Sequence, residues 1–296
     1  PGCDRLSMSF DERGGAPVGR PSSEGRPTGV SADTSAAVAE PRVRRARPRA
    51  RTVVLGAILP VGLLAIWWTL SATAAVPSYL LPSPAQVVAA AVELHQQGLL
   101  STYVLISIQR VLIGFSIGAS IGLALGALVG LSRTASDLLS PLLGALRAVP
   151  SLAWLPLLIL LLGIFETPKI TLIAIGAVFP VFTVVSGALR HVDPHLVEVG
   201  RAFGLSRMSL LTDVQLPAVV PAVVSGLRLA LVQSWLFLVA AELAGSSMGL
   251  GFLLSDSQNN GRMDRLFLAI ILLGTLGKLT DALVGIGERA LLKRWG

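Results

Sequence analysis

The stretch EVGRAFGLSRMSLLTDVQLP, residues 198–217, interrupts a chain that otherwise consists largely of long apolar segments. The 296 residues are 53% hydrophobic and only 14% charged, and the mean hydropathy is +0.72. An average soluble domain has about 25% charged residues, so this composition is typical of a membrane protein. The polar stretch therefore divides a membrane domain, and its charges require an explanation.

Segments apolar enough to cross a bilayer, which takes about 20 residues, define the expected spans. They cover residues 53–76, 102–131, 138–163, 170–189, 218–243 and 266–287. The third segment contains Pro141, Arg147, Pro150 and Pro156, which indicates a broken or partly re-entrant helix there. We therefore predict an all-α protein, a polytopic transmembrane helical bundle of about six spans.

Basic residues predict the topology of this bundle. Residues 1–51 are rich in Gly, Pro, Ser and Arg, which predicts a disordered tail, and six arginines between Arg42 and Arg51 place it in the cytoplasm. The alternating loops that follow carry Arg133, Arg190, Arg201, Arg207, Arg289, Lys293 and Arg294 inside, but only Lys169, Arg262 and Arg265 outside. We expect a transmembrane domain over 52–296, with both termini and the loop 190–217 in the cytoplasm.

Several other functions are disfavoured by the composition. The net charge is +7, but the basic residues form no patch interleaved with aromatic residues, so we expect no nucleic-acid partner. The single cysteine, Cys3, excludes an intrachain disulfide. His191, Asp193 and His195 lie close in sequence, but Pro194 interrupts the helix that would set their spacing, so we expect no metal site.

Two local patterns predict packing on the outer side and within the bilayer. Glycines recur every fourth residue in the second span, at Gly114, Gly118, Gly122, Gly126 and Gly130. Such a stripe lets helix backbones approach closely in lipid. Ser83 and Pro84 begin an expected short outer helix that ends at Gly98. Whether this helix packs on the bundle or contacts a partner is left open by the pattern.

The polar loop has the signals of two short helices. Asp193 caps the first, Pro194 takes its first position and Gly204 ends it. Ser206 caps the second, which we expect to stop before Pro217.

The first of these helices is amphipathic. Leu196, Val199 and Phe203 share one face, Gly200 beside them permits close approach, and Glu198 points elsewhere. Helices this short need a surface to pack on. That surface is either a groove of another protein or the chain's own membrane domain.

Glu198, Gly204 and the run Val214-Gln215-Leu216-Pro217 resemble the E-A-A, G, I-x-L-P loop of ATP-binding-cassette (ABC) importer permeases. The departures are Val199 and Gly200 for the two alanines and Val214 for isoleucine. The resemblance implies that the loop 190–217 couples this chain to a cytoplasmic ATPase, with Glu198 at the contact and Gly204 making the turn. The implied coupling residues are Leu196, Glu198, Val199, Gly200, Phe203, Gly204, Leu216 and Pro217.

The resemblance extends over residues 56–295 and indicates one branch of these permeases. LLPSPAQVVAA (80–90), QRVLIGFSIG (109–118), LRAVPSLAWLPLLILLLGI (146–164) and AAELAGSSMGLGFLL (240–254) are similar to the nitrate, taurine and sulfonate branch, and within it to the aliphatic sulfonate permeases.

This resemblance implies the type I ABC importer permease fold in the inner membrane. It also implies a homodimer, two ABC ATPase subunits and an extracytoplasmic solute-binding protein. ATP and Mg would then bind to the partner ATPase, and no cofactor to this chain. The nearest phosphate-loop lookalike in the chain, GTLGKLT at 274–280, has the wrong glycine spacing and lacks the hydroxyl after lysine.

Three charged residues in the spans are candidates for the translocation path or a gate. The guanidinium groups of Arg147 and Arg228 suit an oxyanion such as a sulfonate, although both residues could instead reach lipid phosphates. Glu242 could gate the path or pair internally, and is a poor direct ligand for an anion. Taurine, nitrate and a vitamin precursor stay open as alternative substrates. An ion-gradient-driven secondary transporter is a rival class, disfavoured because no internal repeat is evident.

Overall fold

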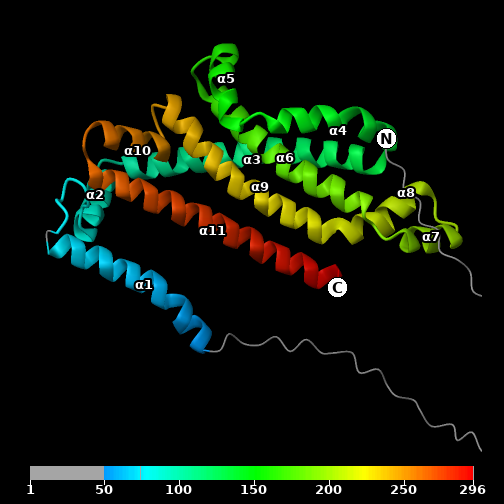
Figure 1. Ribbon diagram of the computed structural model, residues 1–296, viewed down its shortest axis with the longest axis horizontal. Helices are drawn as coiled ribbons and strands as arrows, with labels where there is room; N and C mark the ends of the chain where they lie inside the picture. The colour runs from blue at the N-terminus through cyan, green and yellow to red at the C-terminus, as the bar shows by residue number, and fades with distance from the viewer. Residues whose placement is uncertain (1–49, 74, 296) are drawn as a thin grey trace, which may run out of the picture. The chain divides into compact units, whose positions relative to one another are not determined.

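The computed structural model describes residues 50–73 and 75–295, and all regular elements in them are helical (Figure 1). The chain divides into two units, 1–52 and 53–296. The helices are α1 (Ala50–Ala72), α2 (Pro84–Gln96), α3 (Leu99–Leu131), α4 (Arg133–Ala148), η1 (Ser151–Ala153), α5 (Trp154–Leu162), α6 (Glu166–Arg190), α7 (Pro194–Ala202), α8 (Arg207–Ser209), the π-helix η2 (Leu210–Gln215), α9 (Leu216–Gly245), α10 (Leu250–Asn259) and α11 (Met263–Trp295). The all-α prediction is confirmed for the described residues. The predicted tail over 1–51 lies outside them, apart from Ala50 and Arg51, with which α1 begins.

Four helices in the described part of the chain are long and apolar enough to cross a membrane. They are Leu99–Leu131, Glu166–Arg190, Leu210–Gly245 and Met263–Ala290. The helix α1 covers the first expected span from Ala50 to Ala72. The expected count of about six spans is not confirmed, and the third expected span does not form one full-length helix.

The third expected span, 138–163, is two helices rather than one. The amphipathic helix α4 ends at Ala148, Val149 takes an extended conformation with ψ 124°, and α5 begins only at Trp154. A proline sterically disfavours helical geometry in the residue before it, so Pro150 explains the extended Val149. The prediction of an interrupted helix at this place is confirmed.

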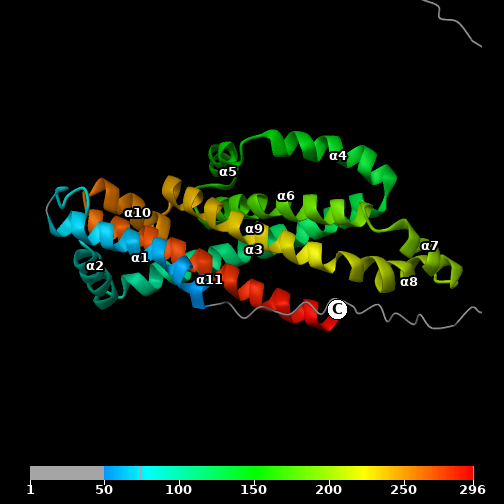
Figure 2. The ribbon, with the colours of Figure 1, turned by 60° about the horizontal axis from the view of Figure 1, so that its bottom comes forward.

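The centre of the bundle is the seam between α3 and α6, and α6 packs in turn on α9 (Figures 1 and 2). The glycine stripe of α3 faces α6 along this seam. A Cβ added at Gly122 would lie 2.7 Å from the carbonyl oxygen of Val178, and one at Gly126 would lie 2.8 Å from Cβ of Val185. Only glycine permits this backbone approach, so the stripe has the packing role that the sequence predicts.

The short helix α2, which the sequence placed on the outer side, packs against the bundle. Ser83 and Gln86 form a capping box at its start, and Pro84 occupies its first position. Val87, Ala90 and Leu94 are buried in a cluster with residues of α3, α10 and α11. Of the two possibilities that the sequence left open for this helix, packing on the bundle is therefore the one observed.

The second helix of the polar loop does not stop before Pro217, contrary to the prediction. Residues 210–245 form one continuous helix, in which the π-helix Leu210–Gln215 leads directly into α9. Pro217 lies in the first turn of α9. The missing N–H of a proline is tolerated where the hydrogen-bond ladder changes register, as it does at the end of a π-helix.

Candidate functional site

The helix α7 presents an uncovered apolar face. Its start follows the prediction, since Asp193 Oδ1 accepts a hydrogen bond of 2.9 Å from the backbone N–H of His195. Leu196 and Val199 are about half exposed, and the side chain of Phe203 is 83% exposed. Burial of apolar surface is the main favourable term in association, so this face has the character of a docking surface.

Two glycines shape the turn after α7. Gly204 has φ +75°, the left-handed conformation that a side chain disfavours. The N–H of Leu205 donates to the carbonyl of Gly200 at 3.1 Å, which closes the turn. Gly200 is buried, and a Cβ there would lie 3.1 Å from Cδ2 of Leu210. The turn therefore folds α7 back onto the π-helix that starts α9.

The remaining coupling residues lie on either side of this turn. The side chain of Glu198 is 71% exposed, and its contact with His195 Nδ1 is a long 3.9 Å. An exposed pair of this kind contributes little, so the carboxylate can bind elsewhere. Leu216 is 43% exposed at the first residue of α9, and Pro217 follows it. The structure thus collects the predicted coupling residues in one exposed helix–turn–helix.

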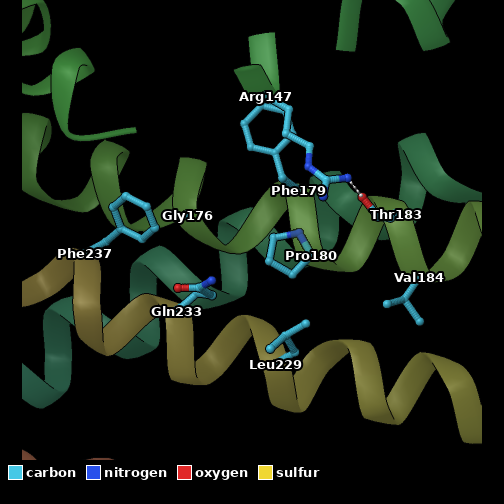
Figure 3. Close-up of a pocket in the computed structure, with 9 residues that line it drawn as sticks. All are labelled: Arg147, Gly176, Phe179, Pro180, Thr183, Val184, Leu229, Gln233 and Phe237. Atoms are coloured by element: carbon cyan, nitrogen blue, oxygen red, sulfur yellow. Dashed lines mark hydrogen bonds between the residues drawn. The ribbon is translucent and has the colours of Figure 1, made fainter. Parts of the chain in front are cut away.

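Arg147 lies at a cavity of about 300 Å³ between α4, α6 and α9 (Figure 3). Its Nη1 donates a hydrogen bond of 3.2 Å to Thr183 Oγ1 on α6. Gln233 of α9 and the rings of Phe179 and Phe237 also line this cavity. The cavity combines one guanidinium with neutral hydrogen-bonding groups and aromatic walls.

Arg228, the second arginine predicted for the path, makes ion pairs. Its Nε donates to Asp281 Oδ1 and its Nη2 donates to Asp281 Oδ2 at 3.0 Å, while Nη1 lies 3.3 Å from Glu288 Oε2. A bidentate pair of this kind satisfies the planar fork of the guanidinium. This geometry favours a role for Arg228 in joining α9 to α11.

Glu242 is buried, with 1% of its surface exposed, and it is hydrogen-bonded on several sides. Its Oε1 accepts from Arg110 Nη1 at 2.7 Å and from Ser107 Oγ at 2.9 Å. Its Oε2 accepts from the N–H of Gly251 at 2.7 Å. Of the two roles considered for Glu242, internal pairing is the one that the structure shows.

The partners of Glu242 extend into a cluster that the sequence reasoning did not assemble. Arg110 also makes a bidentate pair with Glu166, at 2.6 and 2.7 Å. Lys169 Nζ lies 3.1 Å from Glu166 Oε1. We call Ser107, Arg110, Glu166, Lys169 and Glu242 the Arg110 charge cluster. A signal was present, because Arg110 is a charged residue inside a span and such a residue requires a partner.

In the described chain, four helices are long and apolar enough to cross a membrane, a glycine seam joins two of them, and an exposed helix–turn–helix lies between two of the four. These features are those of a polytopic membrane protein. The chain belongs to the family described as the inner membrane component of binding-protein-dependent transport systems, which it matches over residues 118–293. It is therefore a permease subunit of an ABC importer, as the loop predicted.

Several relatives cover most of the chain. SsuC of Escherichia coli (strain K12) is 44% identical over 237 residues, covering 80% of this chain and 90% of that protein. SsuC of Bacillus subtilis (strain 168) is 41% identical over 238 residues, covering 80% and 86%. Both bear names that assign them to aliphatic sulfonates transport. The taurine transport system permease protein TauC of E. coli (strain K12) is 30% identical over 252 residues, covering 83% and 90%.

A solved structure shows the same fold. An inward facing conformation of the MetNI methionine ABC transporter superposes with a TM-score of 0.57 at 20% identity, covering 68% of this chain and 98% of that chain. The expected ABC importer permease fold is thereby confirmed.

Proposed function

We propose that this chain forms the membrane path of an ATP-driven importer of aliphatic sulfonates and that the loop 190–217 binds the cytoplasmic ATPase. The observation that carries the coupling role is the exposed apolar face of α7, formed by Leu196, Val199 and Phe203. An amphipathic helix with a few apolar anchors is a common element for docking into a groove of another protein. Glu198 lies on the same short helix, at its exposed side, where it can bind a cationic group of the ATPase.

The loop is joined rigidly to a helix of the membrane domain. Gly204 and Gly200 hold α7 against the π-helix, and the π-helix continues without a break into α9 past Leu216 and Pro217. A displacement of α7 therefore acts on α9, which lines the cavity at Arg147. Rigid-body alternation of two permease copies, driven by ATPase closure, is the mechanism that this connection serves.

The partners of this importer follow from the family. A solute-binding protein delivers the substrate at the outer side, and two ATPase subunits bind ATP and Mg. This chain supplies no nucleotide site. A second copy of the chain completes the path. Large apolar side chains on α4 and α5, such as Leu138 at 74% exposure and Leu160 at 81%, give each copy an apolar surface for its partner and for lipid.

Both termini and the coupling loop are proposed to be cytoplasmic. The distribution of basic residues supports this orientation. The loops at the end of the bundle that holds the coupling loop carry Arg133, Arg190, Arg201 and Arg207, whereas those at the opposite end carry only Lys169, Arg262 and Arg265 among the described residues. An excess of Lys and Arg on the cytoplasmic side agrees with the positive-inside rule.

The coupling role is tested by co-purification of the ATPase with the permease and by the ATPase activity of the complex. We expect Glu198→Arg to reverse the charge at the contact and Gly204→Val to strain the turn, so that both variants lose ATPase binding and still insert. Asp213→Arg is the matched control, because it reverses an exposed carboxylate of the same loop outside α7. If both α7-loop variants bind the ATPase as the parent does, the coupling proposal is wrong.

The substrate is tested by uptake into proteoliposomes that contain the permease, the ATPase and the binding protein. We expect ATP-dependent uptake of an aliphatic sulfonate, with weaker competition by taurine and nitrate. Uptake of only nitrate, or only of an uncharged vitamin precursor, would refute the sulfonate assignment. Uptake that needs an ion gradient and no ATP would instead indicate a secondary transporter.

A further inference from the structure

We propose that the cavity between α4, α6 and α9 is a binding site within the membrane for an organic monoanion with a short apolar tail. Arg147 would hold the oxyanion, and Phe179 and Phe237 the tail. This inference rests on the proposed function and deepens it, because it assigns part of the substrate selectivity to the permease. A permease that served only as a passage would need no such combination of groups.

The polar side of the cavity suits a sulfonate. Arg147 is joined to Thr183 by a hydrogen bond of 3.2 Å, and Gln233 lines the cavity from α9 (Figure 3). A guanidinium offers a planar fork of donors to an oxyanion, and hydroxyl and amide groups can donate to its remaining oxygens. Three different helices thus contribute one polar group each.

The apolar side of the cavity suits a hydrocarbon chain. Phe179 and Phe237 line it from α6 and α9. Phe237 packs over Gly176, where an added Cβ would lie 2.7 Å from Cε2 of the ring. The ring can occupy this position only because residue 176 has no side chain. Gly176 therefore determines where the apolar wall of the site stands.

The charges of the residues that line the cavity distinguish among the candidate substrates. No acidic residue is present among the residues that line it in the described chain. The ammonium group of taurine would be left without a counter-charge there, and burying an unpaired charge is costly. Nitrate would leave the aromatic walls unfilled. A volume of about 300 Å³ lies at the low end of the range for ligand pockets, which matches a short alkanesulfonate.

The first test compares two arginines of α4 in the reconstituted complex, with binding protein saturated with ethanesulfonate. We expect Arg147→Gln to lower the initial rate of ethanesulfonate uptake about tenfold or more, the effect of losing one charge-assisted pair. Arg133→Gln is the matched control, because Arg133 lies at the other end of α4 and away from the cavity. Size-exclusion chromatography with the ATPase shows that each variant still assembles.

The second test changes selectivity rather than rate. Ethanesulfonate and taurine differ only by the ammonium group, so their uptake ratio reports the charge preference. We expect Leu229→Glu, which places a carboxylate at the cavity, to lower this ratio about tenfold in favour of taurine. Leu236→Glu is the control, since Leu236 is also exposed on α9 but does not line the cavity.

The outcomes separate this inference from the proposed function. If the parent complex imports ethanesulfonate with ATP while Arg147→Gln and Leu229→Glu leave rate and ratio unchanged, the cavity proposal is wrong and the proposed function stands. If the parent complex imports no sulfonate at all, the proposed function fails first.

Discussion

Arg110 and Arg147 are two arginines of the same membrane domain in opposite circumstances. The side chain of Arg110 is only 5% exposed and is paired with Glu166 and Glu242, at 2.6 and 2.7 Å. Arg147 is exposed at a cavity, and its hydrogen bond within the described chain goes to the neutral hydroxyl of Thr183. The charge of a guanidinium paired with two carboxylates is already compensated, whereas a guanidinium bonded to a neutral hydroxyl keeps its full charge for a substrate anion.

This difference shows that the role of a charged residue in a span can be inferred only when its ion-pair and hydrogen-bond partners are known. The Arg110 charge cluster joins α3, α6, α9 and the loop before α10, where Arg110 Nη1 also donates to the carbonyl of Met248 at 2.7 Å. Removing Glu242 would take an acceptor from the buried groups of Arg110 and Ser107. At Arg147 nothing comparable would be left behind. We therefore expect substitutions around Arg110 to lower the stability of the protein, and substitution of Arg147 to lower transport with little effect on stability.

The largest effect is expected from Glu242→Leu. Arg110 keeps its pair with Glu166 in this variant, but leucine cannot accept the hydrogen bonds that Glu242 takes from Arg110, Ser107 and the N–H of Gly251. Each buried donor left without an acceptor costs about 1–3 kcal/mol, so we expect a loss of several kcal/mol. The measurement is the free energy of unfolding in detergent micelles. Glu198→Leu is the control, because Glu198 is 71% exposed and should change stability by less than about 0.5 kcal/mol. A loss of unfolding free energy in Glu198→Leu as large as that in Glu242→Leu would contradict the prediction that the buried partners of Arg110 stabilise the protein.

A smaller effect is expected from Gly122→Val, in the seam that sets the distance between α3 and α6. The new Cβ would lie 2.7 Å from Val178 O and 2.8 Å from Val181 Cβ, and overpacking costs about 1–3 kcal/mol. Gly274→Val is the control, because no atom lies within 4 Å of a Cβ at Gly274. The same unfolding measurement applies, and an unchanged stability would show that the seam can open without cost.

A less buried group of ion pairs tests whether burial, rather than pairing alone, distinguishes Arg110. Arg262 and Arg265 donate hydrogen bonds to Glu93, whose side chain is 41% exposed, and they lower the pKa of that carboxyl. Because the folded pKa is lowered, this contribution to stability is full above the ordinary pKa of 4.5 and is lost as the pH falls through the folded value. We expect the parent to exceed Glu93→Gln in melting temperature by a few degrees at most at neutral pH, and by less in strong acid. A difference that grows in acid would contradict this sign.

The smallest effect on stability is expected from Arg147→Gln. An exposed residue outside any buried network changes the free energy of unfolding by less than about 0.5 kcal/mol, so the variant should melt with the parent even as its sulfonate uptake falls. The melting temperature and the uptake rate are measured on the same preparation. A large loss of stability would place Arg147 in the same structural category as Arg110.

The features that the sequence predicted are local along the chain. The caps at Asp193 and Ser83, the left-handed turn at Gly204 and the break before Pro150 depend on residues within one or two turns. The glycine stripe of α3 follows from a repeat of four residues in the helix period. These patterns, with the loop motif, were sufficient for the family and for the packing role of the stripe. The π-helix before Pro217 was missed, because a continuous helix through a proline depends on a register change that composition does not reveal.

The sequence by itself determined the all-α class, the helix caps, the glycine stripe and the loop motif, because helix period, capping and hydropathy act over short distances along the backbone. Only the tertiary structure decided which charges are satisfied. Arg110 and Glu242 are 132 positions apart, and Arg228 and Asp281 are 53 apart. Whether a charge is paired or left facing a cavity depends on which helix faces meet, and that is why Arg147 could be distinguished from Arg110 and Arg228 only in three dimensions.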